Sequence, residues 1–293
     1  MFRRRDNTPS GTSQYGSMLT GAGRGVSTEQ PVLTLRVGSD LDPGIRRKHR
    51  PNEDTLLVTQ GSMPSASVST SPKPFALLIV ADGMGGQAHG QEASRLAVQS
   101  LAEYMSGSLG SQPSKPENVL SLLIAGVQYA NQAVYQHNRQ QRDDMGTTMT
   151  TALVMDTTAY VAHVGDSRLY LYGQRSGLRQ ITQDHSVVAR LVAAGVIEPE
   201  DIYTHPMRNR ISRSLGQKAS VEVDGTAVPL AAGDLLLVCS DGLWEMVRDQ
   251  QIAAILARPR PHPSETAHAL VQAALAGGGK DNVSVIVGQV SQV

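Results

Sequence analysis

The sequence predicts an α+β fold in which two antiparallel β-sheets pack face to face, with helices outside them. Helical segments stand between blocks of strands instead of alternating with them one by one, which argues against a parallel α/β sheet. Short turns separate the strands predicted at 147–155, 158–165 and 167–172. Because parallel strands need long crossover connections, such short turns indicate a meander of antiparallel neighbours.

The other predicted strands are apolar runs or alternating patterns bounded by turn residues. PVLTLRVGSD, near the start of the chain, alternates apolar and polar residues. TLLVTQ and FALLIVA stand on either side of the polar segment GSMPSASVSTSPKP, so we expect two neighbouring strands joined by a slack surface loop. The chain returns to the sheets in three later segments, SVEVDGTAV, DLLLVCS and NVSVIVGQV.

Helical periodicity accounts for most of the remaining chain. Residues 90–105 place their apolar side chains on one stripe, as an amphipathic helix does. A short helix is predicted at 185–197, and the polar, irregular residues 198–216 follow it, so this pair is interpreted as a small excursion from the main body. Further helices are predicted at 116–140, 249–257 and 262–277.

Composition and charge disfavour several classes of protein. With 26 basic and 26 acidic side chains and 4% aromatic residues, the chain lacks the positive field and the rings expected of a nucleic-acid-binding protein. Cys239 is the only cysteine, and its apolar neighbours predict a buried side chain. No apolar run is long enough to span a membrane and no secretory signal is visible, so we expect a cytoplasmic protein without membrane insertion. Residues 1–30, rich in Gly, Ser, Thr and Arg, predict a flexible tail.

Acidic residues recur where predicted strands end or turn. Asp82 and Asp241 each follow an apolar run and precede a glycine, and four more acids occupy comparable places: Glu53, Asp54, Asp166 and Asp281. Carboxylates brought together repel one another unless a cation neutralises them, and Mg²⁺ and Mn²⁺ prefer such oxygen ligands. The glycines would let backbone carbonyls approach a metal. Asp-Gly is also a common turn dipeptide, and aspartate often caps helices, so the residues alone leave a structural role open.

Eight motifs then occur in a characteristic order: RPNED, VADGMGG, GTTMTTALV, VGDSRLYLY, TQDHS, NRISRSLG, LLLVCSDGLWEMV and KDNVSVIV. In order and approximate spacing they resemble the metal-dependent protein serine/threonine phosphatases of the PPM (protein phosphatase 2C) type, most of all the compact bacterial members. The resemblance runs from about Leu33 to Val290. It implies a β-sandwich flanked by α-helices on both sides, a phosphatase domain over 31–293 and a small flap subdomain at about 185–214.

The resemblance also implies a centre that binds two Mn²⁺ or Mg²⁺ ions. The family's metal ligands match seven positions of this chain: Asp82, Gly83, Asp241, Asp281, Glu53, Asp54 and Asp166. By this match Asp82 bridges the two ions, the carbonyl of Gly83 binds one of them, and Asp241 and Asp281 hold the other. Asp166, together with Asp241, is similar to the position that binds a third, weaker ion. The remaining two acids would act directly or through water.

Such a centre implies an activity. Two metal ions roughly 4 Å apart can share a water and lower its pKa, which supplies a hydroxide nucleophile without any nucleophilic side chain. The resemblance therefore implies hydrolysis of phosphoserine and phosphothreonine monoesters on proteins, in opposition to serine/threonine kinases. The implied partners are phosphorylated proteins, including such kinases, and we expect a monomer.

Basic residues and a histidine near the predicted centre match the family's pattern only in part. Family members usually contact phosphate through an arginine shortly before the acidic pair, and the segment GIRRKHRPNED offers four candidates, of which Arg47 is favoured: Arg46, Arg47, His49 and Arg50. A solvated basic loop is the alternative. His89 stands two residues after Gln87, where many bacterial relatives have histidine, so it is expected at the surface and not as a proton donor. The flap motif THPMRNR either meets the substrate or has a structural role.

Three other interpretations of the sequence compete with this one. GMGGQA fits a dinucleotide-binding fingerprint, but Glu103, about twenty residues on, lies inside a predicted helix and not at a strand end. A PPM-type regulator that binds phosphoproteins without turnover is disfavoured because none of Asp82, Gly83, Asp241 and Asp281 is lost. A metallophosphatase for small phosphoesters would keep the same site and differ only in its substrate.

Overall fold

The structure is a computed structural model that describes residues 33–63, 73–85, 88–109 and 116–292. The predicted flexible tail at 1–30 lies outside the described residues, as does most of the polar segment at 61–74. None of the helices in the described ranges has the length and apolar character needed to cross a membrane.

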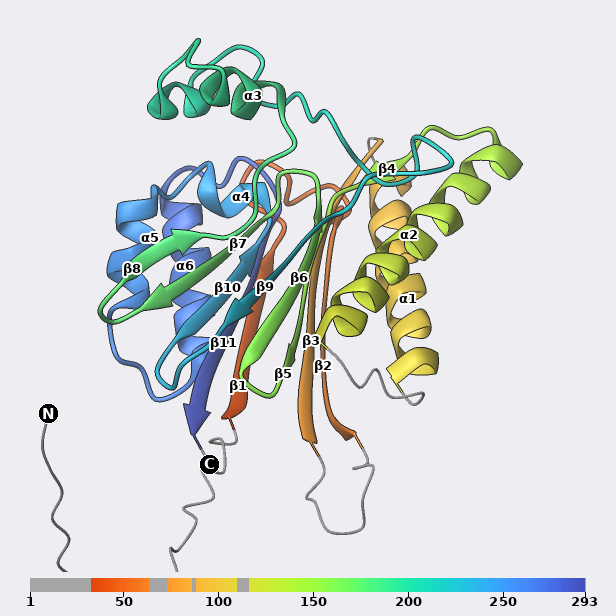
Figure 1. Cartoon of the computed structure of the whole chain (residues 1–293). Helices are drawn as coiled ribbons and strands as arrows, with labels where there is room; N and C mark the ends of the chain where they lie inside the picture. The colour runs from red at the N-terminus through yellow and green to blue at the C-terminus, as the bar shows by residue number, and fades with distance from the viewer. Residues whose placement is uncertain (1–32, 64–72, 86–87, 110–115, 293) are drawn as a thin grey trace, which may run out of the picture. The chain divides into compact units, whose positions relative to one another are not determined.

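Two antiparallel sheets pack face to face, with helices on both outer sides, as predicted (Figure 1). One sheet has the strand order β1 (Leu33–Asp42), β11 (Val283–Gln292), β10 (Leu235–Cys239), β7 (Arg168–Gly173) and β8 (Gly177–Gln180). The other has the order β2 (Asp54–Met63), β3 (Lys73–Met84), β5 (Met149–Met155), β6 (Thr158–Val164) and β9 (Asp224–Pro229), and the short β4 (Gly146–Thr147) pairs with β3. The neighbours β2 and β3 are antiparallel, which confirms the predicted pairing.

The unbroken apolar run in β3 has a simple cause, because both faces of its sheet are covered. Leu78 and Val80 belong to the core between the two sheets. Leu77 and Ile79 point to the opposite face and pack in the core under the helices. Successive side chains of a strand alternate between faces, so a strand covered on both sides needs an apolar residue at every position.

The helices form the two outer layers of the sandwich. α1 (Ala88–Leu109) and α2 (Pro116–Gln141) cover the sheet that contains β3. α4 (Asp241–Trp244), α5 (Asp249–Leu256) and α6 (Pro263–Ala276) cover the sheet that contains β10. The Cys239 side chain is buried in this second outer core, as expected.

The predicted excursion contains a short helix α3 (Val187–Ala193) and a 3-10 helix η1 (Pro199–Tyr203). Figure 1 shows α3 standing off the end of the sandwich, joined to it by two extended segments. Ser186 caps α3, because its hydroxyl accepts a hydrogen bond from the Ala189 N–H at 3.1 Å. We refer to residues 185–214 as the flap.

The predicted meander is wrong at its last strand. β6 pairs with β5 and β9, whereas β7 pairs with β10 and β8 in the other sheet. The chain crosses between the sheets at Gly165, whose φ of 115° is accessible to glycine but strained for other residues. A short turn therefore carries a change of sheet here, and it leaves Asp166 at the end of the sandwich.

Three smaller elements also differ from the prediction. β8 and α4 have only four residues each, too few for a recognisable period. The strand predicted from residue 220 begins at Asp224. Val221 and Val223 before it pack against the core under α1 and α2 but pair with no strand, so their alternation indicated burial and not sheet pairing.

Candidate active site

Strand register brings two of the predicted acids face to face. In the β2–β3 pair, Asp54 is the direct partner of Asp82. Like charges directly opposite each other on neighbouring strands are destabilising. The backbone around Asp82 is nevertheless tightly held, since its N–H donates to Thr148 Oγ1 at 2.9 Å and its carbonyl accepts from the Thr148 N–H at 2.8 Å.

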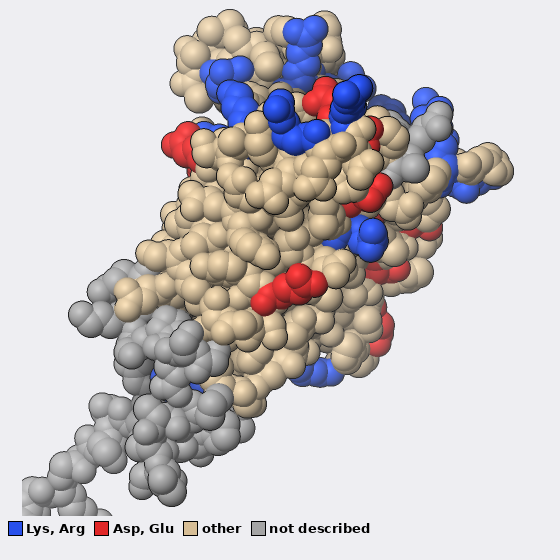
Figure 2. All heavy atoms as spheres, turned by 90° about the vertical axis from the view of Figure 1, so that its right-hand side faces the viewer, with Lys and Arg blue, Asp and Glu red and all other residues tan. Residues whose placement is uncertain are grey.

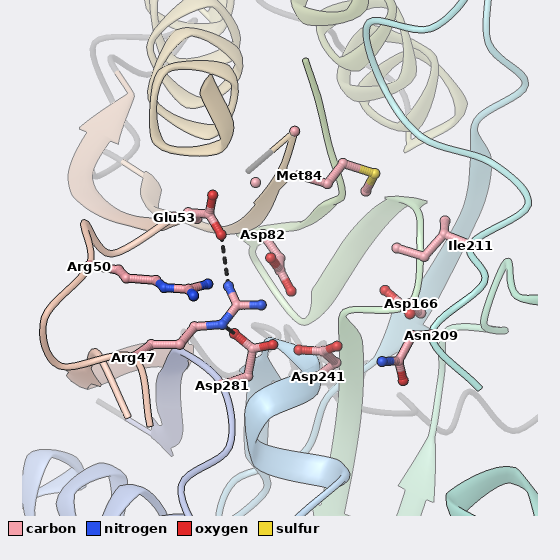
Figure 3. Close-up of a pocket in the computed structure, with 12 residues that line it drawn as sticks. Arg47, Arg50, Glu53, Asp82, Met84, Asp166, Asn209, Ile211, Asp241 and Asp281 are labelled. Carbon is pink, nitrogen blue, oxygen red and sulfur yellow. Dashed lines mark hydrogen bonds and ion pairs between the residues drawn. The ribbon is translucent and has the colours of Figure 1, made fainter. Parts of the chain in front are cut away.

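The other acids reach the same place from different elements. Asp241 is the first residue of α4 and lies two residues after the end of β10, and Asp281 lies two residues before β11. Asp166 follows the crossing from β6 to β7, and its carbonyl accepts from Trp244 Nε1 at 2.9 Å. Figure 3 shows these side chains around one cleft of about 280 Å³, which is also lined by Glu53.

Asp54 is absent from the lining of this cleft, and its side chain is buried. Its Oδ2 accepts a hydrogen bond of 2.7 Å from the Ser240 hydroxyl, and the Ser284 N–H donates to Ser240 Oγ at 3.0 Å. These bonds join β2 to the ends of β10 and β11. Asp54 is therefore in a position to support Asp82 from beneath.

Four of the six acids carry an oxygen that is buried and has no hydrogen-bond partner among the described residues: Glu53 Oε1, Asp54 Oδ1, Asp166 Oδ1 and Asp241 Oδ1. Buried polar atoms are normally satisfied, and an unsatisfied carboxylate oxygen carries a large desolvation cost. Three of these oxygens belong to residues that line the cleft, and oxygens gathered in this way have the chemistry of a cation site.

The electrostatics of the cleft agree with this interpretation. Burial raises the pKa of Asp82 well above its ordinary value, and the neighbouring Asp54 and Asp241 raise it further. Burial likewise raises the pKa of Asp54 to about 6, and burial with the nearby Asp184 raises that of Asp166 to about 7. Ionising these groups together is therefore costly unless positive charge is supplied.

The donor set fits a hard divalent cation, because every candidate ligand is an oxygen. No group of three His, Cys, Asp or Glu side chains within the described ranges could hold one ion by itself. Mg²⁺ commonly takes only one or two carboxylates and keeps several waters. The arrangement therefore fits ions that share Asp82, Asp241 and Asp281 and complete their shells with water and backbone carbonyls.

Arg47 is the basic residue most closely joined to these acids. Its Nη1 lies 2.7 Å from Glu53 Oε2, and its Nε lies 2.9 Å from Asp281 Oδ1, as the dashed lines in Figure 3 mark. Arg50 also lines the cleft and directs its guanidinium into it. Arg46 and His49, the other two candidates, are absent from the cleft lining.

The two glycines after the strand-end aspartates have a packing role in addition to the metal contact predicted for their backbone carbonyls. A Cβ on Gly83 would lie 1.9 Å from the Gly90 carbonyl oxygen of α1, and one on Gly242 would lie 1.9 Å from the Asn282 carbonyl oxygen. Both glycines let another backbone segment pack against the strand end. The close approach is thus to protein, which brings α1 and the Asp281 segment up to the cleft.

Asn282 is a supporting residue that the sequence analysis missed. Its Oδ1 accepts from the Glu53 N–H at 2.9 Å, and its Nδ2 donates to the Pro43 carbonyl at 2.8 Å. One buried amide therefore fixes the segments that carry Glu53 and Asp281 relative to each other. Its place directly after Asp281 in KDNVS was a usable signal, but nothing local indicated its partners.

The flap contributes Asn209 and Ile211 to the cleft wall, so part of the predicted THPMRNR segment does reach it. His89 does not line the cleft. It is exposed, and its Nδ1 lies 3.5 Å from Asp143 Oδ1. A surface position for His89 agrees with the expectation from the sequence.

Comparison with known proteins gives consistent matches. The chain is 38% identical over 213 residues to the serine/threonine phosphatase stp of Listeria monocytogenes, covering 72% of this chain and 83% of that protein. It is 41% identical over 262 residues to the serine/threonine protein phosphatase PstP of Mycobacterium tuberculosis, covering 88% of this chain and 46% of the relative. The chain thus spans about half the length of the second relative.

Solved structures match over the same region. A crystal structure of the Mycobacterium tuberculosis serine/threonine phosphatase PstP/Ppp superposes with a TM-score of 0.73 at 36% identity, covering 88% of this chain and 99% of that one. The catalytic domain of PstP in complex with two manganese ions gives 0.73 at 35% identity, covering 89% and 100%. The sequence model of the family described as Protein phosphatase 2C matches residues 46–277. This chain, with its sandwich and its acid-lined cleft, belongs to the protein phosphatase 2C family.

Proposed function

We propose that this protein hydrolyses phosphoserine and phosphothreonine monoesters on proteins with Mn²⁺ or Mg²⁺ bound at the cleft. The observation that carries the proposal is the set of buried carboxylate oxygens without partners at one cleft of a protein phosphatase 2C fold. A solved relative binds two manganese ions, which supports the same metal for this chain. We also propose that the protein acts in the cytoplasm as a monomer, where it reverses phosphorylation by serine/threonine kinases.

The described side chains suggest how ions would be held. Asp82 lies between the other acids and would bind both ions, with the Gly83 carbonyl as a further ligand of one (Figure 3). Asp241 and Asp281 would hold the second ion. Two more acids would act directly or through water, Glu53 at the cleft wall and Asp54 beneath it. Asp166 lines the cleft near Asp241 and is proposed for a third ion.

The chain's own residues would then bind and orient the phosphoryl group. When bound, the ions would offset charge on the phosphoryl oxygens and lower the pKa of the attacking water. The part of the cleft lining that the structure describes contains no hydroxyl, thiol or imidazole side chain, and its carboxylates are the proposed metal ligands, so water is the fitting nucleophile. Arg47 and Arg50 would bind phosphoryl oxygens, as guanidinium groups commonly do.

Phosphate release from a phosphothreonine peptide tests the proposal. We expect turnover with Mn²⁺ or Mg²⁺ and none with EDTA, because the acids cannot organise the reaction without cations. Folded protein that releases no phosphate with either metal would contradict the enzyme and favour a phosphoprotein-binding regulator. Much faster turnover of several small phosphoesters than of phosphopeptides would instead favour a small-molecule phosphatase.

Replacing Arg47 by alanine should raise KM for the phosphopeptide by about 10- to 100-fold, since a charge-assisted hydrogen bond contributes about 1.5–3 kcal/mol. Arg46→Ala is the matched control, because it removes the same charge from the neighbouring residue, which does not line the cleft. Steady-state kinetics on both variants would measure the difference. An equal rise in KM for the two variants would show that the basic loop acts only through its overall charge.

A further inference from the structure

A second hollow lies at the base of the flap, beside the cleft. It has a volume of about 360 Å³ and is lined by residues 211–214, 217, 218 and 220–222. Ile211 belongs to the walls of both the cleft and the hollow. The two depressions are therefore neighbours that share one apolar side chain.

Gly146 forms a second link between them. A Cβ at this position would lie 3.3 Å from Met84 Cγ, at the cleft, and 3.2 Å from Gln217 Nε2, at the hollow. Gly146 is itself buried, and it brings the Met84 and Gln217 side chains together where the two walls meet. A polypeptide bound at the cleft therefore has the hollow as its neighbour on this side.

The backbone of the hollow is held firmly from below by α2. Asn131 Oδ1 accepts from the Gly216 N–H at 2.9 Å, and its Nδ2 donates to the Lys218 carbonyl at 3.1 Å. Asn138 Nδ2 donates to the Gly216 carbonyl at 3.1 Å. Both asparagines are buried, and Leu215, directly before these anchored residues, is fully buried. The wall is thus preformed, which lowers the entropic cost of binding a ligand there.

One cation of the hollow is free to meet a ligand. The Arg213 guanidinium already pairs with Glu222 at 2.9 Å and with Asp224. Lys218 is exposed, and its ammonium has no ion-pair or hydrogen-bond partner within the described residues. At the flap end of the face drawn in Figure 2, lysine and arginine side chains outnumber the acidic ones among them, which favours acidic polypeptides.

We propose that this hollow is a substrate subsite that binds the polypeptide beside the phosphoresidue, and that Lys218 selects an acidic side chain there. The inference rests on the proposed phosphatase function and goes beyond it by naming a sequence preference. Hydroxyl and amide groups of the hollow can pair with the substrate backbone, while Lys218 supplies a cation that has no ion-pair partner among the described residues.

Peptide kinetics test the subsite. Phosphothreonine peptides carrying a single glutamate or a single lysine, moved through each position on either side of the phosphoresidue, would be compared by kcat/KM. We expect one position at which wild type prefers glutamate by about three- to fivefold, the effect of an exposed ion pair. Lys218→Glu should reverse the preference at that position, and Lys218→Arg should keep it.

Two controls separate this subsite from other effects. Turnover of para-nitrophenyl phosphate, which has no peptide, should be unchanged in Lys218→Glu. Arg179→Glu makes the same charge change on β8 of the other sheet and should leave the peptide preference intact. The subsite proposal would be overturned if the wild type showed no preference for glutamate over lysine at any position. It would also be overturned if Arg179→Glu lost the preference to the same extent as Lys218→Glu. No metal-dependent release from any substrate would overturn the proposed function and the subsite with it.

Discussion

Asp241→Asn is expected to abolish metal-dependent phosphate release while making the metal-free protein more stable at neutral pH. Asp241 is buried, its Oδ1 has no hydrogen-bond partner among the described residues, and burial and the neighbouring Asp166 and Asp281 raise its pKa well above the ordinary value. Asparagine keeps the shape and removes the charge. We expect a loss in kcat/KM on the order of a thousandfold or more, because several kcal/mol of charge stabilisation depend on the bound ions.

The opposite directions of the two effects make this variant informative. A merely disruptive substitution would lower both activity and thermal stability, whereas removal of a repelling carboxylate lowers only activity. Phosphopeptide turnover with Mn²⁺ and thermal unfolding with EDTA measure the two. Asp144→Asn, the same chemical change at an exposed position, is the control and should alter neither. Full metal-dependent activity in Asp241→Asn would rule out the proposed ligand role of Asp241.

The second large effect concerns pH and metal together. The folded protein raises the pKa of Asp54 to about 6 and that of Asp166 to about 7, from ordinary values near 4. A carboxyl group whose pKa is raised by folding binds its proton more tightly in the folded state than in the unfolded state. Its contribution therefore lowers the free energy of unfolding as pH rises from about 4 to about 7, and adds no further change above that range.

Divalent cations should reverse this loss, because they bind the ionised carboxylates that become available over the same interval. We expect Mn²⁺ to raise the thermal midpoint considerably more at pH 7.5 than at pH 5, as measured by scanning calorimetry with and without EDTA. Asp166→Asn should flatten the pH dependence of the metal-free protein between about pH 5 and 7, and Asp144→Asn should not. A metal-induced shift that is equal at both pH values would contradict ionisation of these acids as the source of binding.

Much of the fold could be read from local pattern. The apolar run from Phe75 to Ala81 indicated a buried strand, and the structure confirms it in β3, whose two faces are both covered. The apolar stripe over 90–105 predicted an amphipathic helix, and the structure confirms it as part of α1. These are properties of neighbouring residues, since burial imposes a period of two on strands and 3.6 on helices. β8 and α4 could not be predicted, because four residues are too few to establish a period.

Sequence motifs also identified the acids, but not how they meet. The pairing of Asp54 with Asp82 follows from the β2–β3 register, and the place of Asp166 follows from a change of sheet at Gly165. The run GIRRKHR could not reveal which arginine faces the acids.

The sequence alone therefore determined which apolar runs form buried strands and which acidic residues stand at the ends of those strands. These acids are the residues that can carry a metal-dependent phosphatase site. Tertiary packing determined the rest, including the glycine contacts that draw α1 and the Asp281 segment inward, the amide of Asn282, and the hollow that contains Lys218. The physical reason is the distance along the chain over which each kind of interaction acts. Local patterns record whether a residue is buried, whereas contacts between residues hundreds of positions apart arise only when strands pair and layers close.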